Sequence, residues 1–301
     1  MGIVIAGGTG FLGRPLATAL GPDLVILSRQ PGRPAHESRA RVVQWTPDGT
    51  AGPWASVIDG ADAVINLAGE SIAGARWTDS QKRRILDSRV LATRSLVEAI
   101  AHAASPPPVF VSGSAVGYYG PLGDEIVAED RSPGADFLAG VCMQWEAEAM
   151  RAASPRTRVV CIRTGLVLER DGGALPKMLP PFWLGAGGPV GSGRQYWSWI
   201  HRKDWIDLVR FAIRTDQAAG ALNATAPNPV TNADFARALG RSIGRPSFVP
   251  TPGIALKLLL GEMAESLLLS GQRVVPSKAE RLGYTFAFPD LAGALRAIFT
   301  R

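Results

Sequence analysis

Short apolar, β-branched segments alternate with longer segments of helical periodicity through the first two thirds of the chain. This alternation predicts a doubly wound α/β fold, in which helices cover both faces of a parallel sheet. The expected strands are Ile3–Ala6, Leu24–Leu27, Val42–Gln44, Ala63–Leu67, Val109–Ser112 and Val159–Arg163. The expected helices are Arg14–Leu20, Asp79–Ala103, Ala139–Arg151, Trp205–Thr215, Asn232–Ile243, Ile254–Leu269 and Leu291–Phe299.

The pattern changes after Arg163. Segment Gly172–Gly193 is rich in glycine and proline, which predicts a mobile lid or substrate loop and not a core element. Asn232 is the expected N-cap of the helix that follows. We therefore expect a Rossmann domain over residues 1–245, with segment 166–204 contributing to a cap, and a small mixed C-terminal domain over residues 246–301 that completes this cap.

Glycines spaced three residues apart follow the first strand. Gly7 permits a tight turn, Gly10 lets the backbone approach a phosphate, and Gly13 lets the helix pack closely on the strand. A helix that begins at such a turn directs its unpaired N–H groups and the positive end of its dipole at one point, which suits a pyrophosphate. The motif therefore predicts a dinucleotide site that includes Phe11 and Leu12, in preference to a plain tight turn.

The end of the second strand indicates which dinucleotide is bound. In a site for NAD, an acidic side chain about 20 residues after the glycines accepts hydrogen bonds from the ribose diol. This chain has Ser28 and Arg29 at that place. A guanidinium pairs bidentately with a 2′-phosphate, and Arg33 can add a second contact, so NADP(H) is the predicted cofactor. The alternative is a surface arginine at a strand end.

Composition and charge narrow the classes of function. The 301 residues are 46% apolar, and the formal net charge of +6 comes mostly from scattered arginines, which predicts a basic surface suited to an anionic cofactor and no nucleic-acid partner. The apolar stretches are too short to span a bilayer and no signal peptide is evident, so we expect a cytoplasmic protein without a membrane partner. The two cysteines, Cys142 and Cys161, support neither a disulfide framework nor a metal site.

Four motifs, in matching order and spacing, resemble the extended short-chain dehydrogenase/reductase superfamily. They are the glycine turn, Asn66–Gly69, Ser112–Ala115 and Trp199–Asp204. Longer strings resemble its atypical "epimerase family" branch, which carries an extra C-terminal domain of unknown function; these strings are Asn66–Ile72, Arg83–Val90, Ser114–Gly120 and Gly261–Pro276. The resemblance covers essentially the whole chain and implies an NAD(P)-binding Rossmann fold with a small cap over the active-site crevice.

The resemblance also implies a catalytic serine, tyrosine and lysine supported by an asparagine, and only the serine, Ser114, is present. The tyrosine position falls on Leu138, the lysine position on Cys142 and the asparagine position on Arg89. Leucine cannot transfer a proton, so the usual oxidoreductase mechanism cannot run unchanged.

Three other side chains are candidates for chemistry, each with a structural alternative. Tyr118 can reach the crevice or support the structure, and Glu70 can act as a strand-end general base or cap its loop. Cys142 can be a thiolate nucleophile near a helix N-terminus or a core residue.

Further cofactor contacts are expected after the fourth strand and on the long helix. Asn66, Leu67 and Ala68 are expected to lie along the cofactor, with Asn66 alternatively a simple turn residue. Lys82 and Arg89 share a helix face, which favours contacts with the pyrophosphate or the nicotinamide ribose over a solvated stripe.

Aromatic residues around Gly185–Gly193 predict either the wall of a small-molecule pocket or a seal between two domains. They are Phe182, Trp183, Tyr196, Trp197 and Trp199. By the resemblance, His201 and Asp204 are mostly structural.

Two functions of different classes fit this sequence. The first is an NADP-dependent oxidoreductase or epimerase that acts on a small polar substrate, such as a sugar derivative, in the cleft between sheet and cap. The second is a sensor or interaction protein that retained the cofactor site and lost catalysis, because function resides in the site and not in the fold. A monomer and a homodimer that pairs through helices 79–103 and 139–151 are both expected oligomeric states.

Overall fold

The computed structural model describes residues 2–30 and 40–300, and its centre is a seven-stranded parallel sheet of order β11-β7-β5-β4-β1-β2-β3. The strands are β1 (Ile3–Ala6), β2 (Leu24–Ser28), β3 (Arg41–Gln44), β4 (Ala63–Asn66), β5 (Val109–Ala115), β7 (Arg158–Thr164) and β11 (Gly220–Ala224). The predicted doubly wound α/β fold is confirmed. The sequence analysis missed β11, because its sequence Gly-Ala-Leu-Asn-Ala contains no β-branched residue.

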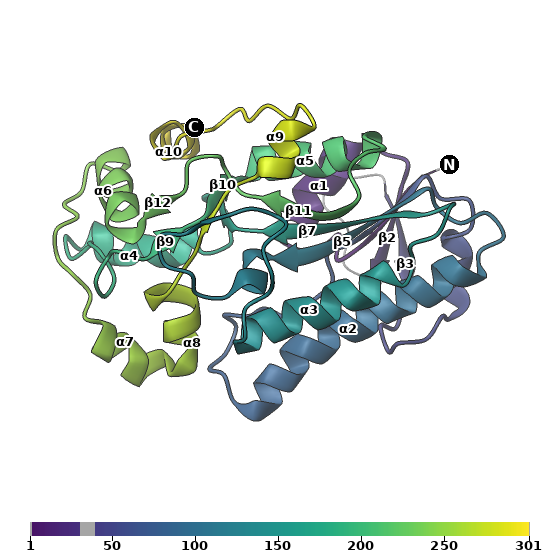
Figure 1. Ribbon diagram of the computed structural model, residues 1–301, viewed down its shortest axis with the longest axis horizontal. Helices are drawn as coiled ribbons and strands as arrows, with labels where there is room; N and C mark the ends of the chain where they lie inside the picture. The colour runs from purple at the N-terminus through teal and green to yellow at the C-terminus, as the bar shows by residue number, and fades with distance from the viewer. Residues whose placement is uncertain (1, 31–39, 301) are drawn as a thin grey trace.

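Helices cover both faces of this sheet (Figure 1). Helices α1 (Gly13–Leu20) and α5 (Arg202–Arg214) lie on one face, and α2 (Asp79–His102) and α3 (Phe137–Met150) lie on the other. The strands are therefore buried on both sides, which explains their continuous apolar runs.

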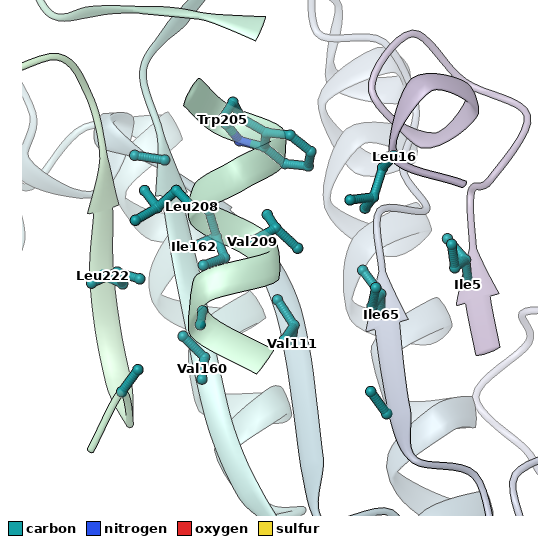
Figure 2. Close-up of a cluster of buried hydrophobic side chains, with 14 of the residues drawn as sticks. Ile5, Leu16, Ile65, Val111, Val160, Ile162, Trp205, Leu208, Val209 and Leu222 are labelled. Atoms are coloured by element: carbon teal, nitrogen blue, oxygen red, sulfur yellow. The ribbon is translucent and has the colours of Figure 1, made fainter. Parts of the chain in front are cut away.

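Two clusters of buried side chains hold these layers together. In the first, Leu16 and Leu208 pack on Ile65 and Val111 of the sheet (Figure 2). The second cluster lies on the opposite face, where Leu96 is among the fully buried residues. Each aliphatic side chain that is fully buried contributes about 1.5–3 kcal/mol.

A group of smaller elements, here called the C-terminal lobe, gathers at one end of the sheet, on the left in Figure 1. It contains α4 (Leu175–Trp183), α6 (Asn232–Ser242), α7 (Gly253–Leu260), α8 (Glu262–Ala264), the π-helix η3 (Glu265–Leu269) and α10 (Leu291–Phe299). The remaining helices are η1 (Pro53–Val57), η2 (Val116–Tyr119) and α9 (Ser277–Arg281). Three two-stranded pairings complete the fold: β6 (Ile126–Val127) with β13 (Arg273–Val274), β8 (Leu166–Leu168) with β10 (Trp199–His201), and β9 (Tyr196–Trp197) with β12 (Val230–Thr231).

The lobe corrects two sequence predictions in its first half. Segment 172–193 contains helix α4, whose Leu175, Leu179 and Phe182 are buried in the lobe's core, so a wholly mobile loop was wrong. The N-cap of α6 is Thr231, whose hydroxyl accepts a hydrogen bond from the Asp234 N–H at 3.1 Å. Asn232 instead accepts from the backbone N–H of Val190 at 2.7 Å, which ties α6 to the preceding loop.

The single helix expected at Ile254–Leu269 is also wrong. Gly261 has φ +64°, a left-handed conformation that ends α7 and lets the chain restart in α8. No helix of the described residues is both long and apolar enough to cross a bilayer.

Candidate functional site

The glycine turn after β1 is closed by contacts between backbones. The N–H of Gly10 donates to the Gly7 carbonyl at 3.1 Å, and a Cβ at Gly13 would lie 2.2 Å from that same oxygen. Gly7 has φ +81°, and a Cβ there would lie 2.6 Å from the carbonyl carbon of Leu67. The turn therefore requires glycine at these positions, and it lies directly against the segment that follows β4.

The two residues that lead into α1 leave backbone N–H donors available beside this turn. Within the part of the chain that the structure describes, no acceptor takes the N–H groups of Phe11 and Leu12. The Phe11 ring packs against the loop that follows β8, since a Cβ at Gly172 would lie 2.5 Å from the ring. Phe11 and Leu12 thus offer backbone donors at the positive end of α1, and these fit a pyrophosphate.

A cavity of about 310 Å³ opens beside the turn, and two arginines contribute to its walls. Its lining consists of Thr9, Gly10, Phe11, Arg14, Pro15, Asp171 and Arg202. The Arg202 guanidinium also pairs with Glu169 at 3.2 Å. The surroundings of the turn are therefore polar and carry cations, as an anionic group requires.

The end of β2 presents Arg29 to solvent. Ser28 closes the local turn, because its hydroxyl donates to the Gln30 carbonyl at 3.0 Å and accepts from the Gln30 N–H at 3.2 Å. Arg29 is exposed, so its guanidinium is available to a ligand. Arg33, the other predicted contact, lies outside the described residues.

Asn66 at the end of β4 is fully buried, and its side chain is used within the protein. Its amide nitrogen donates to Thr93 Oγ1 at 2.9 Å, and its amide oxygen accepts from the Ala68 N–H at 3.1 Å. The side chain shapes the turn, which favours the turn alternative over a side-chain cofactor contact. Leu67 and Ala68 place backbone beside Gly7.

Lys82 and Arg89 do not act as the pair that the sequence predicted. The Lys82 ammonium forms an ion pair with Glu262 and lies 5.1 Å from the centre of the Phe137 ring, so it joins α2 to the C-terminal lobe. The position of Lys82 therefore does not support the predicted contact with the cofactor. Arg89 lies against Gly69, next to the turn after β4.

Ser114, the retained serine, is at the carboxyl end of β5 in a buried ionic network. Its hydroxyl donates to Glu146 Oε1 at 2.6 Å. Arg163 Nε and Nη2 each donate to a Glu146 carboxylate oxygen at 2.8 Å. The sequence analysis missed Glu146 and Arg163; the available signal was a charged residue within each of two mostly apolar segments, α3 and β7.

Two tyrosines extend this network. Arg163 Nη1 donates to the Tyr119 hydroxyl at 2.9 Å, and that hydroxyl donates to Asn223 Oδ1 at 2.7 Å. Burial raises the pKa of Tyr119 to about 12. The Tyr118 ring lies on the same guanidinium, 3.5 Å from ring centre to guanidinium carbon. Tyr118 therefore covers Arg163, and its role in proton transfer stays a prediction.

Cys142 does not have the environment of a nucleophile. Burial, followed by the nearby Glu146 carboxylate, raises the pKa of its thiol to about 11, and its sulfur donates to the Ala115 carbonyl at 3.7 Å. The thiol is buried and lies beyond the first turn of α3, which favours the core alternative over a thiolate nucleophile.

Glu70 remains a candidate by position. Its N–H donates to Ser88 Oγ at 2.9 Å, which fixes the loop after β4 to α2. Its carboxylate is close enough to Arg89 to raise the pKa of that guanidinium, against the larger lowering effect of burial. The general-base role of Glu70 stays a prediction.

Asp204 and two of the loop tryptophans, Trp197 and Trp199, have structural roles. The Asp204 carboxylate accepts the N–H groups of Ala287 and Phe288, both at 2.8 Å. Trp197 and Trp199 are buried in the core of the C-terminal lobe. For these two rings a packing role is therefore favoured over the wall of a pocket.

Other residues at the site complete the picture. His201 caps α5, where its Nδ1 accepts from the Lys203 N–H at 3.0 Å. Among the described residues, no group of three or more His, Cys, Asp or Glu side chains could hold a metal ion.

Comparison with known proteins places this geometry in a family. Residues 3–224 match the model of the NAD dependent epimerase/dehydratase family, and residues 251–298 match a domain of unknown function. Epimerase family protein SDR39U1 of Homo sapiens is 38% identical over 305 residues, covering 99% of this chain and 99% of that protein. Epimerase family protein YfhF of Bacillus subtilis is 38% identical and covers 98% of this chain and 97% of its own length.

A solved structure of human SDR39U1 with NADPH has a TM-score of 0.90 and 36% identity, and the match covers 100% of this chain and 99% of that one. A nucleoside-diphosphate sugar epimerase from Corynebacterium glutamicum has a TM-score of 0.79 and 35% identity, covering 99% of this chain and 58% of that one. With its NAD(P)-binding fold and its glycine turn, this chain belongs to the NAD dependent epimerase/dehydratase family.

Proposed function

We propose that this protein binds NADP(H) along the carboxyl edge of its sheet and acts as an oxidoreductase or epimerase-like enzyme on a small polar substrate. The glycine turn and the free N–H groups of Phe11 and Leu12 would hold the pyrophosphate. Exposed Arg29 would pair with the 2′-phosphate. The human relative whose structure contains NADPH supports the choice of cofactor.

The observation that carries the proposal is the hydrogen bond of 2.6 Å from Ser114 to Glu146. The hydroxyl uses its one O–H to donate a hydrogen bond to the carboxylate. The lone pairs of the serine oxygen therefore remain able to accept a hydrogen bond from a substrate hydroxyl. Arg163 fixes the carboxylate on both oxygens, so Ser114 is held in one orientation. A bound nicotinamide would supply or accept hydride at this edge of the sheet.

A sugar derivative is the substrate class that we propose. Its hydroxyl groups match the acceptor role of Ser114, and the sugar epimerase from C. glutamicum, at 35% identity, supports it. We place this substrate at the carboxyl end of β5, next to Ser114. The segment before β13 borders this place, because Gln272 Nε2 donates to the Val116 carbonyl of η2 at 2.7 Å.

The test incubates the purified protein with NADPH or NADP⁺ and a panel of carbonyl compounds, polyols and nucleotide sugars, while absorbance at the nicotinamide band is followed. We expect turnover with at least one member and its loss in Ser114→Ala. Thr18→Ala is the matched control, because that hydroxyl is exposed and bonds to the Arg14 carbonyl of its own helix. Tight NADPH binding without turnover of any compound would contradict the enzyme.

The second candidate is a catalytically silent NADP(H)-binding sensor or interaction protein. Leu138 and Cys142 favour it, because a leucine and a buried thiol of raised pKa stand where the resemblance places the tyrosine and the lysine. It predicts that NADPH changes the protein's thermal stability or hydrogen exchange without any turnover.

A further inference from the structure

Arg89 is a half-buried cation without a carboxylate partner. Among the described residues, no carboxylate oxygen comes within 4.0 Å of its guanidinium, and one nitrogen, Nη1, donates to the Ile85 carbonyl at 2.9 Å. The Glu70 carboxylate acts on Arg89 only from beyond this ion-pair distance. A cation removed from water without a direct ion pair is costly, so such groups in proteins usually meet a partner. The remaining N–H groups of Arg89 are therefore available to a ligand.

The position of Arg89 in the fold tells which ligand group it meets. In the sheet, β1 has β2 on one side and β4, followed by β5, on the other. If the pyrophosphate lies at the β1 turn, one half of the dinucleotide extends over β2 toward Arg29. The other half must then extend over β4 and β5, since neighbouring strands are about 4.8 Å apart.

Arg89 lies on this second side. The β4 segment lies against the β1 turn at Leu67, and two residues further a Cβ at Gly69 would be 3.3 Å from the guanidinium carbon of Arg89. The guanidinium is held there by the Trp145 ring of α3, with 5.2 Å between its carbon and the ring centre. Its place is therefore fixed by packing from two helices.

The neighbouring position on α3 supplies no cation. Cys142 is close enough to Arg89 that each affects the pKa of the other, and its thiol is neutral and bonded to the Ala115 carbonyl. Ser114 and Cys142 are thus both occupied by protein partners. Arg89 is a cationic donor on this side of the turn and makes no direct ion pair among the described residues.

We propose that Arg89 replaces, from α2, the cation that Cys142 does not provide from α3, and that it donates hydrogen bonds to the hydroxyl oxygens of the nicotinamide ribose. The inference rests on the proposed binding of NADP(H). The two N–H groups on one edge of a guanidinium match the spacing of a vicinal diol as donors, and the charge strengthens both hydrogen bonds. Arg89 is in this sense a positioning residue for the nicotinamide half of the cofactor.

The experiment separates the two halves of the cofactor by titrating each variant with NADPH and with adenosine 2′,5′-bisphosphate, which lacks the nicotinamide ribose. Arg89→Met removes the charge and keeps the length of the side chain. We expect it to weaken NADPH about tenfold to a hundredfold and to change the affinity for the bisphosphate less than about twofold. Arg83→Met is the matched control on an exposed position of the same helix, and both affinities should stay at the wild-type value.

Arg89→Lys keeps a cation and three donors, so it should retain more NADPH affinity than Arg89→Met. Unchanged NADPH binding in Arg89→Met, or an equal loss for both ligands, would overturn the inference. If Arg89→Met does not fold, as checked by its thermal transition, Arg89→Lys carries the test alone: it must weaken NADPH and spare the bisphosphate, and equal effects overturn the inference. Failure of the wild-type protein to bind either ligand would instead contradict the proposed function.

Discussion

The two sides of the sheet's carboxyl edge are built in different ways. On the β1 and β2 side, a turn of glycines and backbone N–H groups offers positions that any pyrophosphate can occupy. On the β5 and β7 side, the ion pair of Glu146 and Arg163 and the hydroxyl of Ser114 form a buried network of side chains. The first side recognises a shape common to many cofactors, and we propose that chemistry and substrate choice depend on the side chains of the second.

The largest expected effect tests the network side. Arg163→Met leaves the Glu146 carboxylate buried without its cation, which should lower the free energy of unfolding by about 3–5 kcal/mol, measured by urea denaturation. Arg94→Met is the matched control. Arg94 is 42% exposed and pairs with Glu148, which is on α3 like Glu146, so its loss should cost about 0–1 kcal/mol. Equal losses in both variants would mean that the β5 and β7 side is an ordinary surface pair.

The glycine side has a smaller effect on stability and a larger one on binding. Gly13→Ala places a methyl group 2.2 Å from the Gly7 carbonyl, so the turn must open, at a cost of about 1–3 kcal/mol. We expect calorimetric NADPH titration to give no measurable binding. In the control Gly140→Ala, no atom lies within 4 Å of the new Cβ, and both stability and binding should be retained. Full NADPH affinity in Gly13→Ala would show that the turn is not the pyrophosphate site.

The contrast explains which parts were predictable from sequence. Gly7, Gly10 and Gly13 act through local geometry, so their spacing predicts both the turn and its ligand. Glu146 and Arg163 depend on a contact between α3 and β7, and Lys82 meets a partner 180 residues away, so no local pattern reveals either pair. Tertiary contacts likewise decide burial, and burial raises the pKa of Cys142, which favours the core alternative over the nucleophile.

Arg29 tests whether the first side also selects between cofactors. Arg29→Asp replaces the cation for a 2′-phosphate with a carboxylate that suits a ribose diol, so the preference for NADPH over NADH should fall about tenfold to a hundredfold. The dissociation constants of both cofactors measure this. Arg41→Asp, an exposed change of the same charge on β3, should leave the preference as it was. An unchanged ratio in Arg29→Asp would remove Arg29 as the reader of the 2′-phosphate.

The smallest effect concerns the thiol on the network side. The pKa of Cys142 is raised from 9.0 to about 11 in the folded protein, so the unfolded chain loses this proton first as the pH rises. Unfolding therefore releases a proton between pH 9 and about 11, and the free energy of unfolding should fall across that range. Urea denaturation at pH 8 and at pH 10.5 measures this fall, which should be smaller in Cys142→Ala than in the wild-type protein. An equal fall in both proteins would contradict the prediction.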